Sequence, residues 1–150
     1  MSNWIYMNKE VTKLEDFPNH DCAIGFVYRI THIESGKFYI GKKVLEFSKR
    51  TAISLREKKA TGTRKKTKIV CKPSNWLDYW GSCKELTTEI KLIGKDKFKR
   101  EILELCFNKR YLHFCELEHQ IKRNVLRVNS YNANILGRYF IKDMKNCKHE

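Results

Sequence analysis

The stretch Gly25–Lys43, GFVYRITHIESGKFYIGKK, predicts two short strands joined by a turn. Over residues 24–31 the larger apolar side chains fall at every second position, the pattern of a half-buried strand (Ile24, Phe26, Tyr28, Ile30). IESGK supplies the turn, and residues 37–41 return as the second strand. With the turn at Ser35-Gly36, Tyr28 and Tyr39 would share one face of this hairpin, where the ordinary role of a strand tyrosine is packing.

Two helices and a third strand are expected after the hairpin. One helix is predicted from about Ser48 to Lys58, and the aperiodic KKATGTRKKTK that follows predicts a loop. Ser82 and Glu85 have capping-box spacing before a helix that ends at Gly94 and carries an apolar stripe (Leu86, Ile90, Ile93). FKREILELC alternates and predicts the third strand.

The last long helix is predicted in RYLHFCELEHQIKRNVL, with one inward stripe (Phe114, Leu117, Ile121, Val125). Together these elements predict one α+β domain in which a small antiparallel sheet of three strands is flanked by helices. We expect a leader over 1–23, the domain over 24–136 with a basic insertion at about 58–72, and a tail over 137–150.

Net charge points to a polyanionic partner. The chain carries +14, and Lys42–Lys72 holds twelve Lys or Arg against two Glu. A solvated loop is the plain alternative, but such clusters bind nucleic acid well because they release counterions from phosphates. No run of 18 apolar residues predicts a membrane span, and Met1–Glu10 has no signal-peptide pattern, so we expect a cytoplasmic protein without a membrane partner.

Six cysteines lie at positions 22, 71, 83, 106, 115 and 147, without a C-x-x-C pair. We therefore expect free thiols in a reducing compartment. Cys115 and His119 are one helical turn apart, with Cys106 and His113 nearby, which is a zinc-like pattern. Buried thiols with surface histidines are the alternative, and the one that we favour.

A resemblance to a known family rests on the hairpin. Tyr39-Ile40-Gly41 stands eleven residues after Phe26-Val27-Tyr28, counted between the tyrosines, and the pair resembles the signature of the GIY-YIG nuclease superfamily over about residues 24–136. Gly-Ile-Tyr is usual at the first half-motif, where this chain has Phe26. The resemblance implies a GIY-YIG fold and a homing-endonuclease-like enzyme that hydrolyses duplex DNA with Mg²⁺ or Mn²⁺, similar to small phage-encoded members that act in the host cytoplasm.

The resemblance also implies roles for particular residues. Tyr28 and Tyr39 would orient or deprotonate the attacking water, Lys42 follows the motif glycine, and Arg50 would stabilise phosphate charge. Asn132 would support the site, with Asn134 in reserve. A free phenol has a pKa near 10, so the tyrosines would need nearby cations to lower it. Affinity for DNA would come from basic residues (Lys43, Arg64, Lys65, Lys66, Lys68).

Two glutamates compete for the metal. Glu118 shares the predicted apolar stripe, whereas Glu116 lies with Leu112 and Gln120, about 200° away around the helix. Small phage members favour the Glu116 position, so both stay open.

The same residues are compatible with two other functions. Phe26 in place of glycine could mark a decayed nuclease that only binds DNA, and the partner could be RNA. The sequence assigns no oligomeric state.

Overall fold

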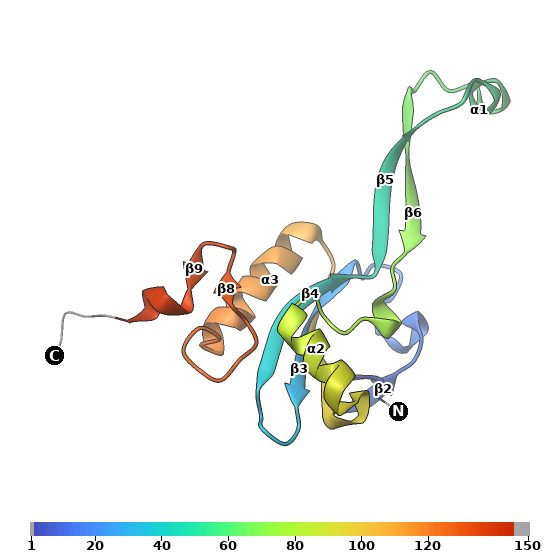
Figure 1. Cartoon of the computed structure of the whole chain (residues 1–150). Coiled ribbons are helices and arrows are strands. Elements are labelled where there is room, and N and C mark those ends of the chain that lie inside the picture. The colour runs from blue at the N-terminus through green and yellow to red at the C-terminus, as the bar shows by residue number, and fades with distance from the viewer. Residues whose placement is uncertain (1, 146–150) are drawn as a thin grey trace.

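The computed structural model describes residues 2–145, and its centre is a five-stranded sheet in the order β2-β1-β7-β3-β4 (Figure 1). Strand β3 (Gly25–His32) pairs antiparallel with β4 (Phe38–Val44) and with β7 (Phe98–Cys106), which confirms the hairpin and the third strand. The α+β class is confirmed as well, but the sheet has five strands instead of three.

The two further strands come from residues that we expected in a leader. Strand β1 (Trp4–Tyr6) runs parallel to β7 and antiparallel to β2 (Lys9–Val11). Arg100 of β7 is buried and donates to the carbonyl oxygens of Ser2, Leu77 and Tyr79, while its guanidinium lies 4.5 Å from the Trp4 ring. These contacts tie the first residues into the core.

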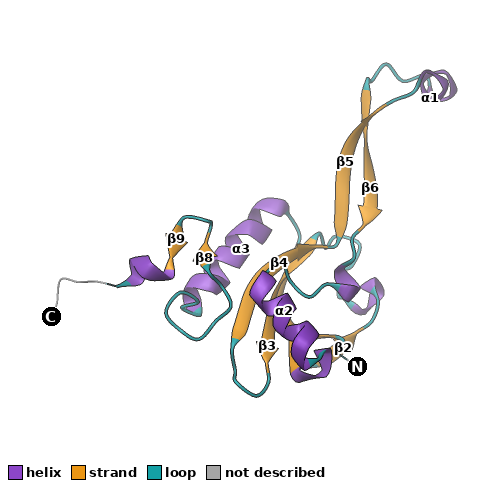
Figure 2. Cartoon of the chain, viewed as in Figure 1, coloured by secondary structure: helices purple, strands orange, loops and turns teal. Residues whose placement is uncertain are grey.

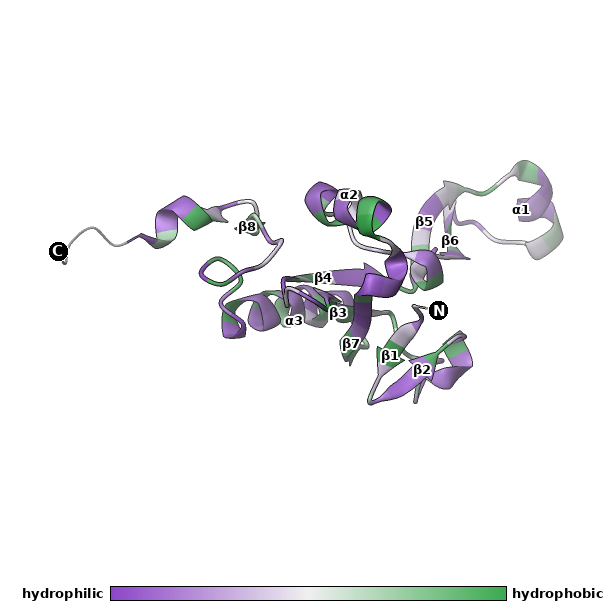
Figure 3. Ribbon diagram, turned by 60° about the horizontal axis from the view of Figure 1, so that its bottom comes forward, coloured by the Kyte–Doolittle hydropathy of each residue, from purple (hydrophilic) through white to green (hydrophobic). Residues whose placement is uncertain are grey.

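Helices cover both faces of the sheet. Figure 3 shows α2 (Lys84–Ile93) and α3 (Lys109–Lys122) on opposite sides of β3 and β4. Because successive residues of a strand point to opposite faces, β3 contributes to two cores. Phe26, Tyr28 and Ile30 pack with Leu86 and Ile90 of α2, whereas Val27 packs with residues of α3 (Leu112, Cys115).

Helix α2 agrees with the sequence in its core and differs at its start. Leu86 and Ile90 are buried and Gly94 ends the helix, as predicted. The N-cap is Cys83, without a side-chain bond, so Ser82 lies one residue too early to cap it and the predicted capping box is wrong. Ile93 is 44% exposed because it lies beyond the part of α2 that meets the sheet.

The predicted apolar stripe of the last long helix is half right, because Leu117 and Val125 pack into the core whereas Phe114 and Ile121 do not. Phe114 and Ile121 are each 56% exposed, and the buried residues are Leu112, Cys115 and Gln120. Gln120 tolerates burial because its amide donates to the Ile40 carbonyl oxygen at 3.2 Å. A satisfied polar group therefore occupies the sheet-facing side of α3, where the sequence led us to expect apolar side chains.

Residues 46–73 form an arm that projects from the sheet (Figure 2). Strands β5 (Glu46–Ala52) and β6 (Thr67–Pro73) pair antiparallel as a separate two-stranded sheet, and α1 (Leu55–Thr61) lies at its far end. The predicted helix at 48–58 is strand over its first five residues, and the predicted loop at 58–68 is strand at its end. Ladder pairing along an isolated hairpin overrides the weak local pattern.

The remaining elements are short. Single 3-10 turns occur at Leu14–Asp16, Trp76–Asp78, Lys95–Lys97 and Ile141–Met144, and a small hairpin joins β8 (Asn134–Ile135) to β9 (Tyr139–Phe140). Within residues 2–145, no helix combines the length and apolarity needed to cross a bilayer. The five cysteines in this range are free thiols, and Cys147 lies outside it.

Candidate active site

The register of the hairpin brings the two tyrosines onto one face. Tyr28 lies opposite Gly41 and Tyr39 lies opposite Ile30, so the rings meet diagonally with centroids 6.1 Å apart. A Cβ atom on residue 41 would lie 2.5 Å from the Tyr28 hydroxyl and 2.8 Å from the Tyr39 ring. The absence of a side chain at Gly41 therefore leaves room for both tyrosine rings on this face of β4.

The two phenols differ in access. Tyr28 is fully buried, whereas Tyr39 is partly exposed and its hydroxyl lies 3.2 Å from that of Ser82. Burial is the main reason that both pKa values lie above the ordinary tyrosine value, with the neighbouring acidic groups adding to it. The expected lowering by cations is absent from the described residues. Lys43, for example, places its ammonium over the Tyr79 ring at 4.0 Å.

A cleft of about 480 Å³ opens at the free edge of β4. Its walls come from β4, the start of α2, the inner side of α3 and the segment after α3. Its polar lining includes Tyr39, Lys42, Ser82, Lys84, His113, Glu116, Gln120 and Asn132. Side chains from four parts of the chain therefore converge on one hollow beside the tyrosine motif.

Glu116 and Glu118 have clearly different surroundings. The Glu116 carboxylate is 18% exposed, lines the cleft and forms an ion pair with the Lys42 ammonium. Glu118 is 34% exposed and pairs with Lys122 one turn further along the helix, at 3.6 Å. The structure thus brings Glu116 together with Tyr39 and Lys42, and it places Glu118 away from them.

Asn132 supports the cleft through the backbone. It is buried, its side-chain oxygen accepts from the Ile40 amide at 3.0 Å, and its side-chain nitrogen donates to the Ile40 carbonyl oxygen at 2.9 Å. This two-point contact satisfies the outer edge of β4, the strand that carries Tyr39. Asn134, the reserve candidate, has its side-chain oxygen bonded to the Gly137 amide at 2.8 Å.

The predicted cations are spread beyond the cleft. Arg50 is exposed on β5 opposite Ile69 and does not line the cleft. Lys43 donates to Asn75 at 2.8 Å, beside the base of the arm. Lys68 pairs with Glu57 near the far end of the arm, where the other predicted DNA contacts are exposed (Arg64, Lys65, Lys66).

Sequence reasoning missed several lining residues. Gln120 stands one helical turn after Glu116, so the same helix face could have indicated it. Ser82, Lys84 and His113 had no signal of this kind, because their approach depends on how α2 and α3 pack against the sheet.

Packing in the core explains why Phe26 stands at the first half-motif. Phe26 is fully buried and packs edge-on against Trp4, with ring centroids 5.1 Å apart. Phe26 therefore serves packing and lies outside the cleft lining, so its difference from glycine leaves the site residues in place.

The chain also matches a family model. The family described as "Putative endonuclease segE, GIY-YIG domain" matches residues 4–140. No curated protein and no solved structure matches the chain. The match takes in both half-motifs, the cleft and the strand β1 that completes the sheet. The chain belongs to the GIY-YIG nuclease superfamily.

Proposed function

We propose that the protein is a divalent-metal-dependent endonuclease that hydrolyses phosphodiester bonds in duplex DNA. The observation that carries the proposal is the meeting of Tyr39, Lys42 and Glu116 in one cleft at the edge of β4. Hydrolysis of a phosphodiester requires an oriented water, stabilisation of phosphoryl charge and assistance to the leaving oxygen. Phenol, ammonium and carboxylate groups supply donors and acceptors suited to these tasks.

Glu116 fits a metal ligand better than Glu118. Its carboxylate is mostly shielded and faces a polar hollow, where a metal ion would displace the ammonium of Lys42. Mg²⁺ prefers oxygen ligands and is commonly held by one or two carboxylates, with water and substrate phosphate completing its shell. A bound Mg²⁺ or Mn²⁺ would supply Lewis-acid stabilisation of phosphate charge. Lys42 would then be free to contact the phosphate.

Tyr39 would act as a neutral phenol. Burial raises its pKa, so the hydroxyl keeps its proton at pH 7. In that state it orients water or donates a hydrogen bond to an oxygen of the phosphate. Tyr28 lies behind it, fully buried, and fixes the position of its ring.

The arm would hold the DNA. Its 28 residues carry ten Lys or Arg and two Glu. A two-stranded ribbon is narrow enough to enter the major groove of B-DNA, and its cations would release counterions from phosphates. Lys43, near the base of the arm, and Arg50, further out along β5, would contact phosphates between the groove and the cleft. Homing-endonuclease-like cleavage in a phage-infected host is the setting that we propose for this activity.

The test is single-turnover nicking of a supercoiled plasmid. We expect nicking with Mg²⁺ and none with EDTA. Glu116→Gln should lower the rate by about a hundredfold or more, a typical loss for a positioned catalytic group. The matched variant Glu118→Gln, two residues along the same helix, should cut within about twofold of the wild type.

Two outcomes would overturn the proposal. Tight DNA binding without Mg²⁺-dependent nicking would make the chain a DNA-binding protein on a nuclease scaffold. If RNA competes for binding to the protein better than duplex DNA does, the substrate would be RNA.

A further inference from the structure

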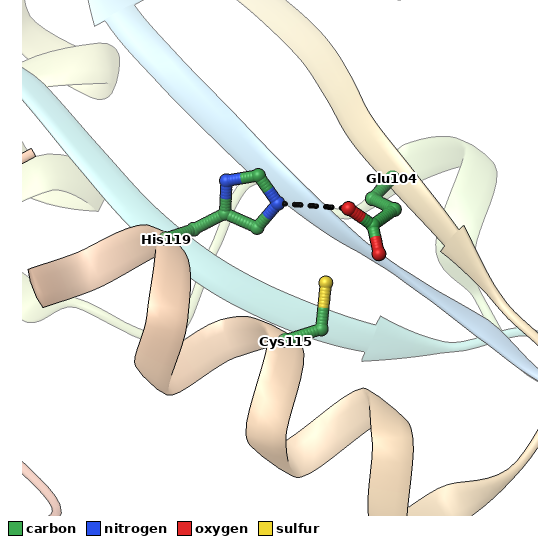
Figure 4. A group of neighbouring side chains, drawn as sticks. All are labelled: Glu104, Cys115 and His119. Atoms are coloured by element: carbon green, nitrogen blue, oxygen red, sulfur yellow. Dashed lines mark hydrogen bonds and ion pairs between the residues drawn. The ribbon is translucent and has the colours of Figure 1, made fainter. Parts of the chain in front are cut away.

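A second group of side chains lies between β7 and α3 (Figure 4). Cys115 and His119 extend from one face of α3, and Glu104 extends toward them from β7. Their ligand atoms all lie within 4.8 Å of one another, and the Glu104 carboxylate is 3.3 Å from the His119 Nε2 atom. None of these three residues lines the cleft at β4.

A β-bulge aims Glu104 at this position. Val27 pairs with Glu104 and Tyr28 pairs with Ile102, so Leu103 is the extra residue on β7. Residues directly opposite in a ladder share a face, and Val27 belongs to the core under α3. The bulge therefore turns Glu104 toward α3, as bulges commonly re-aim a side chain.

We propose that Glu104, Cys115 and His119 bind Zn²⁺, with a water molecule completing a tetrahedral shell. Sulfur, nitrogen and carboxylate oxygen are the ligands that Zn²⁺ takes in tetrahedral sites. Two ligand atoms at about 2.1 Å from a tetrahedral ion lie about 3.4 Å apart, close to the 3.3 Å between Glu104 and His119. Cys106, buried two residues after Glu104, stands outside this group of mutually close ligand atoms.

The surroundings of the group resemble those of a metal site. Zinc ligands are usually held by hydrogen bonds from a second layer of residues, and here the Tyr111 hydroxyl donates to the Glu104 carboxylate. Binding would release one proton, from the Cys115 thiol, so the affinity should increase with pH.

The hydrogen bond between Arg123 and His119 would have to break for the metal to bind. Its Nη1 atom donates to the His119 Nδ1 atom at 2.6 Å, which leaves the ring proton on Nε2, facing Glu104. Zn²⁺ needs the Nε2 lone pair, so the proton must move to Nδ1 and Arg123 must turn to solvent. Arg123→Ala should consequently raise the zinc affinity, which a purely hydrogen-bonded group would not predict.

The site would clamp α3 to β7 and would be separate from Mg²⁺ at Glu116. Two ligands come from the helix and one from the strand, so one ion would join the elements that form this side of the core. Glu116 is next to Cys115 in the chain, but it pairs with Lys42 of β4. The clamp therefore fixes the helix that presents Glu116 without sharing its carboxylate.

The experiment is binding of Zn²⁺ and Co²⁺ to the metal-free full chain. We expect one equivalent of Zn²⁺ by elemental analysis and, at Zn²⁺ a hundredfold above its Kd, a rise in Tm of about 5–10 °C. Co²⁺ should give a thiolate charge-transfer band. Cys115→Ala, His119→Ala and the isosteric Glu104→Gln should abolish or weaken both signals.

Two substitutions serve as matched controls. Cys71→Ala, on the arm, and His20→Ala, before β3, should keep both signals. A wild-type chain without Zn²⁺-dependent stabilisation and without the Co²⁺ band overturns the site, as does equal binding in all variants. The readouts need no nuclease activity, so failure of Mg²⁺-dependent nicking leaves this inference untouched.

Discussion

Tyr39 and Tyr28 have the same chemistry and different surroundings. Tyr39 lines the cleft, whereas Tyr28 is fully buried behind it. We expect Tyr39→Phe to lower the single-turnover nicking rate by about a hundredfold, because it removes the hydroxyl and keeps the ring. Tyr28→Phe should lower the rate less.

Thermal melting and DNA binding serve as controls for both tyrosine variants. Each should stay folded and bind DNA. Near-wild-type nicking by Tyr39→Phe would return that residue to a packing role.

The choice between Glu116 and Glu118 marks the limit of sequence reasoning at the residue scale. The tyrosines and Gly41 could be placed from the hairpin alone, because strand alternation fixes which side chains share a face. The glutamates could not, since the apolar Phe114 and Ile121 suggested the wrong inner face for α3. Gln120 and His119 lie inward because each has a polar partner, which spacing alone does not reveal.

The arm is the element that sequence reasoning described least well. Its charge was evident, but its strands were not, because lysine and arginine interrupt any apolar alternation over residues 46–73. The pairing of β5 with β6 also divides the side chains between the two faces of the arm. Lys49, Lys68 and Lys72 share one face, whereas Arg50 lies on the other with Ser48, whose hydroxyl accepts from Lys109 of α3.

Cations at the far end of the arm should control affinity without much effect on chemistry. We expect neutralising four of them (Arg64, Lys65, Lys66, Lys68) to weaken binding to all duplexes alike. The dependence of log K on log salt should flatten by about 0.9 for each phosphate that the arm no longer neutralises. The rate at saturating DNA should stay near that of the wild type.

Binding isotherms from 50 to 200 mM salt give the slope; an unchanged slope in the four-residue variant would show that the tip of the arm does not touch DNA.

At the scale of the whole molecule, buried phenols make stability depend on alkaline pH. Burial raises the pKa of Tyr28 and of Tyr39, so between pH 10 and the raised values the folded chain holds more protons than the unfolded chain. Stability is therefore intact below about pH 10 and falls as the pH rises, by about 1.4 kcal/mol per pH unit for each such tyrosine.

Melting curves from pH 8 to 11 measure this fall, and Tyr28→Phe should show a shallower one. A flat profile through pH 11 would mean that both phenols ionise as freely in the folded chain as in the unfolded one.

The parallel pairing of β1 with β7 has a consequence for synthesis on the ribosome. Trp4 meets Arg100, so the β1–β2 hairpin, which can pair early, has no place in the sheet until residues nearly one hundred positions later have been made. The β3–β4 hairpin can close early, since its strands adjoin in sequence. Contacts between distant segments slow folding. The β7 side of β1 must therefore stay unpaired while β3, β4, the arm and α2 leave the ribosome ahead of β7.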